Sequence, residues 1–530
     1  MPAPLFLVGF MAAGKTTVGR LLAQATGRRF VDLDDVIAEQ GEPAAVLVAR
    51  DEPEFRRREA AALAQVIGET DAPIVATGGG CAAYGDNMTK MRTAGLVVAL
   101  DVELAAARAR AAGGPERPLL AHDERAARLA AQRAPAYRRA HAVVDTTRRS
   151  LVEVVTAVAE VERAWYRLPP ARRDASLLAL GDRTYPVAIH DRAVDGDLVR
   201  AYVQDATRVV VITDHEVGRH WQATAVAALQ GAPDVLAIEP GEASKSLAVY
   251  GAMCEALVAG GVDRGSVLVA LGGGVVGDLT GFIAATLFRG IPVIQLPTTL
   301  VAMTDSAIGG KTAVDLDAGK NLVGAFWQPR LVACGLETLS TLAPRERRAG
   351  FGELWKYALL DGGELWQLVD SCAPWAAGAA DALPPALHEV IQRSIAYKAA
   401  IVGSDEREQT GRRALLNLGH TIGHAIESAT GLHHGEAVGL GLIAAARVSA
   451  AIAGARRDLE AEITAALRRT GLPAELDSLL TDDVLERVKV DKKRLGESLR
   501  FIAIREVGAC DPVEIAVTEL RRILRPDRAP

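Results

Sequence analysis

Short apolar runs alternate with helical patterns along much of this 530-residue chain. Residues 4–8, 96–100, 209–212 and 267–271 are composed of apolar side chains, as strands covered on both faces are. Segments with the spacing of amphipathic helices lie between such runs. This alternation predicts an α/β fold, in which parallel sheets are flanked by helices.

The alternation is interrupted by residues 166–175, where prolines and arginines are concentrated as in a linker. We therefore expect a first domain over residues 1–165 and a Rossmann-like α/β subdomain over residues 176–340. From residue 341 the pattern is mostly helical, which predicts a helical subdomain over residues 341–526. A chain of this length is expected to hold about two to four domains.

The composition argues against several functional classes. The formal net charge is -6, so no overall positive field favours nucleic acid or an anionic membrane as a partner. The five cysteines are scattered and form no Cys-x-x-Cys pair, which is typical of a reducing compartment, and we expect a cytoplasmic protein. Arg447 interrupts the apolar run at residues 439–455, which favours a core helix over a membrane span.

The first motif has the form G-x4-G-K-T, from Gly9 to Thr16, between an apolar run and a helical pattern. A P-loop requires this context: backbone N–H groups surround the phosphates, Lys15 offsets their charge, and the Thr16 hydroxyl binds Mg²⁺. The motif therefore predicts an ATP and Mg²⁺ site, with a simple glycine-rich turn as the alternative. It does not identify the acceptor of the phosphoryl group.

Beyond the P-loop the chain carries acidic, arginine and glycine residues at characteristic spacings. They are Asp32, Asp34, Arg56, Gly78, Gly79, Gly80, Arg117 and Arg133. In order and spacing this set resembles shikimate kinase over residues 1–165. The resemblance implies that the first domain phosphorylates shikimate with ATP.

The resemblance also implies roles for these residues. Asp32 holds Mg²⁺ together with Thr16, and Asp34 orients the acceptor hydroxyl and accepts its proton. Arg56 and Arg133 bind the substrate carboxylate, and the three glycines let the backbone approach the substrate ring. The implied ATP-binding residues are Gly9, Ala12, Ala13, Gly14, Lys15, Thr16, Thr17, Arg110 and Arg117, of which Lys15 and Arg117 also serve catalysis.

One position departs from the family pattern. Ala12 stands where shikimate kinases often have glycine. A Cβ is tolerated there only at negative φ, which we therefore expect for Ala12.

Two further features lie in the second part of the chain. Four of the ten histidines fall within residues 420–434, and His420 and His424 are four residues apart, on one face of a helix. Clustered neutral imidazoles suit zinc, with hydrogen-bonded core histidines as the alternative. The stretch from Leu271 to Asp278 contains G-x-G-x-x-G, but it lacks the acidic residue about 20 positions further on that a dinucleotide fingerprint has.

Motifs around these two features provide a more specific pattern. They include Pro240-Gly241-Glu242, Lys245, Pro297-Thr298-Thr299, Asp305, Lys311, Lys320-Asn321, Glu353, Lys356, Lys398, Arg413 and Asn417. In order and spacing they resemble 3-dehydroquinate synthase over residues 176–526. Other sugar-phosphate cyclases and the iron-type dehydrogenases remain alternatives. The resemblance implies an NAD- and zinc-dependent conversion of 3-deoxy-arabino-heptulosonate 7-phosphate to 3-dehydroquinate and phosphate.

The resemblance assigns three sets of residues to this second site. Glu353, His420 and His434 are the implied ligands of Zn²⁺ or Co²⁺. The implied NAD-binding residues are Asp214, Glu242, Lys245, Gly272, Gly273, Gly274, Asp278, Thr298, Thr299, Lys320 and Thr341. The implied substrate-binding residues are Asp305, Lys311, Asn321, Lys356, Lys398, Arg413, Asn417, His424 and Lys493, with Lys492 as an alternative to Lys493. Lys311, Lys356 and His424 are also expected to act in catalysis, and a homodimer through the synthase part is expected.

Overall fold

The computed structural model describes residues 2–39, 41, 43–112, 123–231, 233–490 and 498–525. The chain separates into two compact units. One comprises Met1–Ala188 with Ala399–Ser404, and the other comprises Ile189–Lys398 with Asp405–Pro530. The division falls after Ala188, whereas the linker was expected at residues 166–175. The exact domain boundaries therefore stay a prediction.

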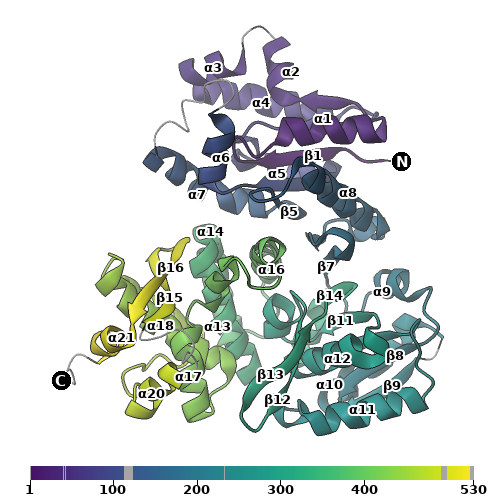
Figure 1. The fold of residues 1–530 in the computed structure, drawn as a ribbon, viewed down its shortest axis with the longest axis vertical. Helices are drawn as coiled ribbons and strands as arrows, with labels where there is room; N and C mark the ends of the chain where they lie inside the picture. Colours follow the sequence, from purple (N-terminus) through teal and green to yellow (C-terminus); the bar gives the residue numbers. More distant parts are fainter. Residues whose placement is uncertain are drawn as a thin grey trace. The chain divides into compact units, whose positions relative to one another are not determined.

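The first unit is built on a parallel sheet with the strand order β2-β3-β1-β4-β5. Figure 1 labels β1 and β5 of this sheet and the helices of the unit. Its strands are β1 (Leu5–Gly9), β2 (Phe30–Asp32), β3 (Ile74–Ala76), β4 (Leu96–Asp101) and β5 (Ala142–Asp145). The helices are α1 (Lys15–Thr26), α2 (Leu33–Glu39), α3 (Ala44–Arg50), α4 (Glu52–Ile67), α5 (Asn87–Ala94), α6 (Leu104–Ala111), α7 (Asp123–Arg138) and α8 (Leu151–Arg167). The central strand β1 is wholly buried, as its apolar sequence predicts, and it delivers the P-loop to the middle of the sheet edge.

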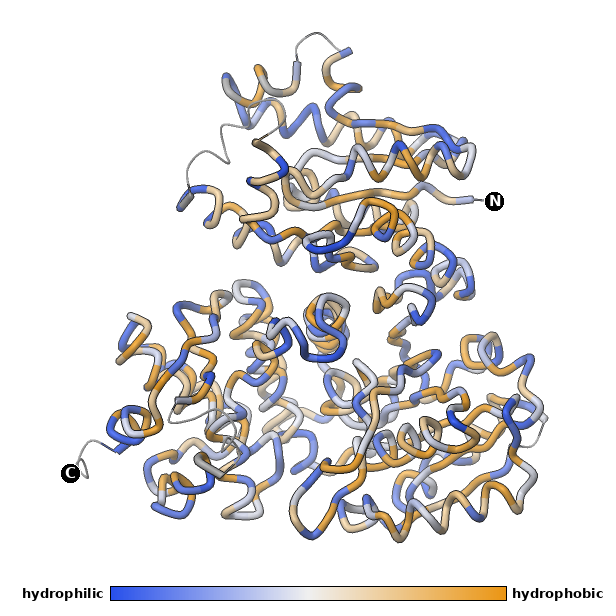
Figure 2. Tube along the Cα trace, in the orientation of Figure 1, coloured by the Kyte–Doolittle hydropathy of each residue, from blue (hydrophilic) through white to orange (hydrophobic). Residues whose placement is uncertain are grey.

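The second unit contains five adjacent parallel strands in the order β14-β11-β10-β8-β9. They are β8 (Val209–Asp214), β9 (Asp234–Ile238), β10 (Val267–Gly272), β11 (Val293–Pro297) and β14 (Leu331–Gly335), with helices α9 (Gly196–Val203), α10 (His215–Leu229), α11 (Leu247–Ala259) and α12 (Gly274–Thr286). One antiparallel pair, β12 (Lys311–Leu316) with β13 (Gly319–Phe326), accompanies them. A second antiparallel pair joins β6 (Ser176–Leu178) to β7 (Tyr185–His190), and β6 with most of β7 belongs to the first unit. Strand β10 is buried along its length, and Figure 2 shows the hydrophobic character of the sheet strands.

The rest of the second unit is mostly helical, as expected. It comprises α13 (Pro344–Asp361), α14 (Glu364–Ser371), α15 (Ala373–Ala376), most of α16 (Leu387–Ser404), α17 (His420–Thr430), α18 (His434–Ile452), α19 (Leu459–Arg469), α20 (Asp482–Val490) and α21 (Val517–Leu524), with the hairpin β15 (Ser498–Glu506) and β16 (Ala509–Ala516). Among the described residues, α18 alone is long and apolar enough to cross a membrane. Because 78% of its apolar window is buried inside the protein, α18 fits the predicted core helix.

Candidate active sites

The P-loop connects β1 to α1 at the carboxyl edge of the first sheet. Lys15 Nζ donates hydrogen bonds to the carbonyl oxygens of Gly9 at 2.8 Å and Phe10 at 3.0 Å, so the amine lies within the loop. Thr16 Oγ1 donates to Asp32 Oδ2, at the end of β2, at 2.8 Å. The hydroxyl and carboxylate predicted to bind Mg²⁺ are therefore neighbours, and both are oxygen ligands of the kind that Mg²⁺ prefers.

The expectation for Ala12 is wrong. Its φ is 60°, in the left-handed region, and the next glycine, Gly14, has a φ of 98°. Ala12 adopts this conformation within a turn in which Ala13 N donates to the Phe10 carbonyl oxygen at 3.3 Å. The alanine therefore retains strain of about 1 kcal/mol in the phosphate loop.

The predicted substrate clamp contains a buried glutamate that the sequence reasoning did not assign. Arg56 Nη1 donates to Glu59 Oε2 at 2.6 Å, and Glu59 is fully buried. A Cβ on Gly80 would collide with the Arg56 guanidinium, and one on Gly78 would collide with Glu59. These glycines therefore make room for the clamp itself, in addition to any approach to a substrate. The sequence could have indicated this pair, because residues three positions apart on a helix, such as Arg56 and Glu59, are neighbours.

The remaining acceptor-side residues lie around this clamp. Arg133, on α7, is largely buried, and its guanidinium lies 3.5 Å from the position that a Cβ on Gly79 would take. The amide of Asp34 donates to Asp32 Oδ1 at 3.2 Å, at the start of α2. Partial desolvation, followed by the negative charge of Asp32, raises the pKa of Asp34. A carboxylate with a raised pKa is a better proton acceptor, which suits the expected role of Asp34.

The nucleotide side of this site is partly described. Arg110 Nη1 donates to the Thr146 hydroxyl at 3.0 Å, after β5, so its guanidinium is held by the sheet edge. Thr17 is exposed on the first turn of α1. Arg117 lies outside the described residues, and its expected closure over the phosphoryl group stays a prediction.

In the second unit, the three predicted metal ligands come together. Glu353 on α13, His420 at the start of α17 and His434 at the start of α18 each offer a ligand atom within 4.8 Å of the others. Glu353 Oε1 lies 3.3 Å from His420 Nε2 and 3.0 Å from His434 Nε2. His420 and His434 lie 67 and 81 positions after Glu353 in the sequence, yet the fold brings all three side chains together.

Close packing of α13 and α18 makes this convergence possible. A Cβ on Gly352 would collide with the Gly435 carbonyl oxygen, and a Cβ on Gly435 would collide with the Ala349 carbonyl oxygen. Each glycine directly neighbours a ligand, Glu353 or His434. The two glycines therefore let the backbones approach closely enough for a short glutamate–imidazole contact.

Hydrogen bonds fix both imidazoles with Nε2 turned to Glu353. His420 Nδ1 lies 3.0 Å from the Leu418 carbonyl oxygen, which can only accept, so Nδ1 carries the proton. His434 Nδ1 lies 3.0 Å from Glu427 Oε2. Although burial by itself lowers the pKa of His434, its hydrogen bonds to Glu353 and Glu427 raise that pKa to about 10. The cluster thus favours a positive charge at its centre.

A lysine–aspartate cluster lies next to Glu353. Lys356 Nζ contacts Glu353 Oε2 at 2.5 Å and Asp305 Oδ1 at 3.5 Å, and Lys398 Nζ donates to Asp305 Oδ1 at 2.8 Å. The Tyr357 hydroxyl also donates to Asp305 Oδ1, at 2.8 Å, a contact that the sequence reasoning did not assign. Burial opposes ionisation of Asp305, but Lys356 and Lys398 hold its pKa well below the usual range. Burial lowers the pKa of Lys398 to about 8.

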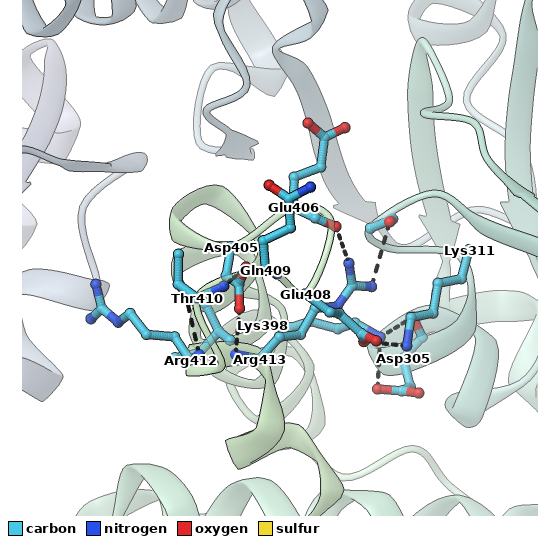
Figure 3. Close-up of polar contacts among 12 residues, drawn as sticks. Asp305, Lys311, Lys398, Asp405, Glu406, Glu408, Gln409, Thr410, Arg412 and Arg413 are labelled. Carbon is cyan, nitrogen blue, oxygen red and sulfur yellow. Dashed lines mark hydrogen bonds and ion pairs between the residues drawn. The ribbon is translucent and has the colours of Figure 1, made fainter. Parts of the chain in front are cut away.

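Two further predicted substrate residues share an internal anion. Figure 3 shows Arg413 and Lys311 turned toward Glu408. The Glu408 carboxylate forms an ion pair with Lys311 and lies 3.5 Å from Arg413 Nε. Arg413 Nη1 also donates to the Glu406 carbonyl oxygen at 2.6 Å. The sequence reasoning missed Glu408, which forms ion pairs with the two cations expected to bind the substrate.

The predicted NAD-binding residues follow adjacent strands at one sheet edge. Asp214 ends β8 and caps α10, since its Oδ1 accepts from Val217 N at 2.8 Å. The glycines 272–274 lead from β10 into α12, and Thr298 and Thr299 follow β11. The carboxyl edge of parallel strands is the usual nucleotide site of α/β sheets, which agrees with the dinucleotide prediction.

Other predicted NAD-binding residues are tied by ion pairs and hydrogen bonds. Lys245 Nζ lies 2.7 Å from Asp278 Oδ2 and 3.6 Å from Glu242 Oε1. Burial raises the pKa of Asp278 to about 6, against the attraction of Lys245. Thr341 Oγ1 accepts from Trp221 Nε1 at 2.9 Å. Lys320 Nζ, on β13, forms an ion pair with Glu427 Oε1 at 2.7 Å.

The remaining predicted substrate-binding residues are His424, Asn417, Asn321 and one of Lys492 or Lys493. The His424 ring is exposed, with its centroid 5.1 Å from that of His420 and 5.7 Å from that of His434. Asn417 is exposed before α17, and Asn321 lies near the start of β13 with a φ of 57°. Lys492 and Lys493 lie outside the described residues, so the choice between them stays open.

Three family models match the chain. Shikimate kinase matches residues 11–162, the 3-dehydroquinate synthase N-terminal model matches residues 235–349, and the C-terminal model matches residues 350–494. The 3-dehydroquinate synthase of Caulobacter vibrioides (strain NA1000 / CB15N) is 43% identical over 345 residues, which cover 62% of this chain and 92% of that protein.

Two solved structures are also similar to this chain. A 2-deoxy-scyllo-inosose synthase complexed with carbaglucose-6-phosphate, NAD⁺ and Co²⁺ is 27% identical, with a TM-score of 0.59, and covers 66% of this chain and 99% of its own. ValA, the 2-epi-5-epi-valiolone synthase of Streptomyces hygroscopicus subsp. jinggangensis 5008 with NAD⁺ and Zn²⁺ bound, is 26% identical, with a TM-score of 0.59, and covers 64% of this chain and 96% of its own.

The fold and the two clusters thus define a P-loop kinase joined to a cyclase with a nucleotide-binding sheet and a helical, histidine-bearing subdomain. The chain belongs to the 3-dehydroquinate synthase family through its larger part and to the shikimate kinase family through its N-terminal part. It is a bifunctional enzyme of the shikimate pathway, as the two resemblances implied.

Proposed function

We propose that the residues described above carry the two activities in the roles that the sequence predicts. The first unit transfers a phosphoryl group from ATP to shikimate. The second site converts 3-deoxy-arabino-heptulosonate 7-phosphate to 3-dehydroquinate and phosphate. The convergence of Glu353, His420 and His434 carries the proposal for the second site.

The donor set fits a divalent ion. One buried carboxylate and two imidazole Nε2 atoms are ligands of the type and number found in catalytic zinc sites, which keep a position open for substrate. The raised pKa of His434 indicates the same preference, since a proton there provides the positive charge that an ion would otherwise bring. We propose Zn²⁺, with Co²⁺ as the alternative.

When bound, the ion supplies Lewis-acid polarisation of a substrate hydroxyl, and NAD⁺ supplies a reversible hydride acceptor. Lys356 and Lys398 provide fixed positive charge, oriented by Asp305 and Tyr357, next to Glu353. We assign these lysines to the substrate's anionic groups. We assign Lys311 and Arg413, at the Glu408 cluster, to further anionic groups of the same substrate.

In the kinase unit, phosphoryl transfer depends on positioning ATP and shikimate and on offsetting the negative charge of the phosphates. Lys15 lies within the phosphate loop, and the Thr16–Asp32 pair provides oxygen ligands for Mg²⁺. Arg56, held by Glu59, binds the shikimate carboxylate together with Arg133. Asp34 accepts the proton of the attacking hydroxyl. We further propose a cytoplasmic enzyme that forms a homodimer through its synthase part.

A Glu353→Gln variant tests the second site with an internal control in the same chain. We expect loss of bound metal and of phosphate release from the heptulosonate phosphate, because one ligand charge is removed. Shikimate-dependent ADP formation should stay at the wild-type rate. Retention of phosphate release with full metal content would refute the ligand assignment, and net NADH accumulation by the wild type would indicate a simple dehydrogenase.

A further inference from the structure

A continuous series of polar contacts connects the β12–β13 hairpin to the proposed metal ligands. Lys320 Nζ on β13 lies 2.7 Å from Glu427 Oε1, and Glu427 Oε2 lies 3.0 Å from His434 Nδ1. His434 Nε2 in turn lies 3.0 Å from Glu353 Oε1. The Glu427 side chain is 14% exposed, whereas that of Lys320 is 56% exposed. A largely buried carboxylate therefore stands between an exposed cation and an imidazole.

Glu427 uses one oxygen for each neighbour. Its Oε2 lies 3.0 Å from His434 Nδ1, so the other ring nitrogen, Nε2, is the one that faces Glu353. A carboxylate in this position fixes the tautomer and ring orientation of an imidazole and makes it a stronger ligand. His420 has only a neutral carbonyl oxygen, that of Leu418, in the same place. The two imidazoles thus differ in what supports them.

We propose that Glu427 is the positioning residue for the metal ligand His434, and that Lys320 weakens this support until a dinucleotide draws the lysine away. The proposal rests on the metal and NAD sites of the proposed function. While Lys320 binds Oε1, part of the Glu427 charge is compensated. When Lys320 pairs instead with an anionic pyrophosphate, the full negative charge of Glu427 acts on His434, so dinucleotide binding strengthens metal binding. By linkage, metal binding strengthens dinucleotide binding to the same extent.

Metal affinity of the full chain, measured by competition with a chromophoric zinc chelator, tests the positioning role. Glu427→Gln should weaken zinc binding by about 10-fold and Glu427→Ala by up to about 100-fold. Glu427→Asp should restore part of the loss. Glu346→Gln is the matched control, because Glu346 Oε1 pairs with the neighbouring His433 Nδ1 at 2.9 Å and contacts none of the three proposed ligands. That variant should bind zinc as the wild type does.

The same titration with and without NAD⁺ tests the coupling. In the wild type, saturating NAD⁺ should tighten zinc binding by about 5-fold or more. In Lys320→Met, zinc binding without NAD⁺ should already equal that of the NAD⁺-saturated wild type, and NAD⁺ should have no further effect. In Glu427→Gln the NAD⁺ effect should be lost as well.

Several outcomes would overturn the inference. Unchanged zinc affinity in Glu427→Gln and Glu427→Ala, while Glu353→Gln loses the metal, removes the positioning role alone and leaves the proposed function intact. Zinc affinity unaffected by Glu353→Gln indicates instead that the proposed metal site is wrong. Binding of two ions per chain would make Glu427 a direct ligand with His424 and His434, whose ligand atoms also lie within 4.8 Å of one another.

Discussion

The buried amine of Lys398 makes a sharp prediction about stability and pH. Burial lowers the pKa of Lys398 from its ordinary value of 10.5 to about 8, although Asp305 attracts the charge. Between these two values the unfolded chain holds a proton that the folded chain has released. Because the unfolded state binds more protons in this window, the free energy of unfolding rises with pH from about 8 to 10.5.

The size of the change in stability follows from the lowered pKa of Lys398. From pH 8 to pH 9.5 is about 1.5 pH units, and at about 1.36 kcal/mol per unit the wild type gains about 2 kcal/mol. Lys398→Met lacks this titration, and all other groups titrate in both proteins. The difference in stability between wild type and variant should therefore shift by about 2 kcal/mol in favour of the wild type between pH 7 and pH 9.5.

Urea unfolding of both proteins at pH 7 and pH 9.5 measures this difference. Trp165 is the one tryptophan of the first unit and the other five, among them the buried Trp355 and Trp375, lie in the second unit, so a Trp165→Phe background lets tryptophan fluorescence report the unfolding of the second unit. Lys398→Gln, which keeps a polar side chain, should give the same pH-dependent shift as Lys398→Met. A stability difference that stays constant with pH, or moves against the wild type, would refute the reasoning about the buried amine. Both variants should also lose phosphate release.

Three further outcomes are expected. Ala12→Gly should raise the stability of the kinase unit by up to about 1 kcal/mol in thermal unfolding, because it relieves the left-handed strain, and a lower stability would contradict this. Glu408→Gln should lower the KM for the heptulosonate phosphate by roughly 2- to 5-fold, because an internal anion leaves Lys311 and Arg413, whereas a raised KM would make Glu408 a substrate contact. The wild-type chain, given the heptulosonate phosphate, NAD⁺ and ATP, should stop at 3-dehydroquinate, since the two activities are not consecutive in the pathway, and shikimate phosphate in the products would oppose this.

The sequence predicted the sheets well because their strands are buried on both faces. The apolar runs at residues 4–8 and 267–271 supply most of β1 and β10, which are interior strands of the two sheets. The strand–loop–helix context of the P-loop likewise predicted where Lys15 and Thr16 lie. Local pattern carried these inferences, since strand burial and helix starts depend on neighbouring residues.

The supporting carboxylates could not be predicted in the same way. Glu427 acquires its role from His434 on another helix and Lys320 on a hairpin, and Glu408 acquires its role from Lys311. A lone glutamate in a helical pattern gives no sign of such partners, because they arise from tertiary packing. The φ of Ala12 was missed for a related reason: the loop as a whole, and not the residue, determines the backbone conformation.

The central claim is that a carboxylate and two imidazoles from three helices hold one divalent ion. Anomalous diffraction at the zinc edge, from crystals of the full chain grown with zinc and NAD⁺, tests it most directly. The account predicts one peak within about 2.0–2.2 Å of Glu353 Oε1, His420 Nε2 and His434 Nε2. A peak bound elsewhere, or none at these three atoms at full zinc content, would contradict it.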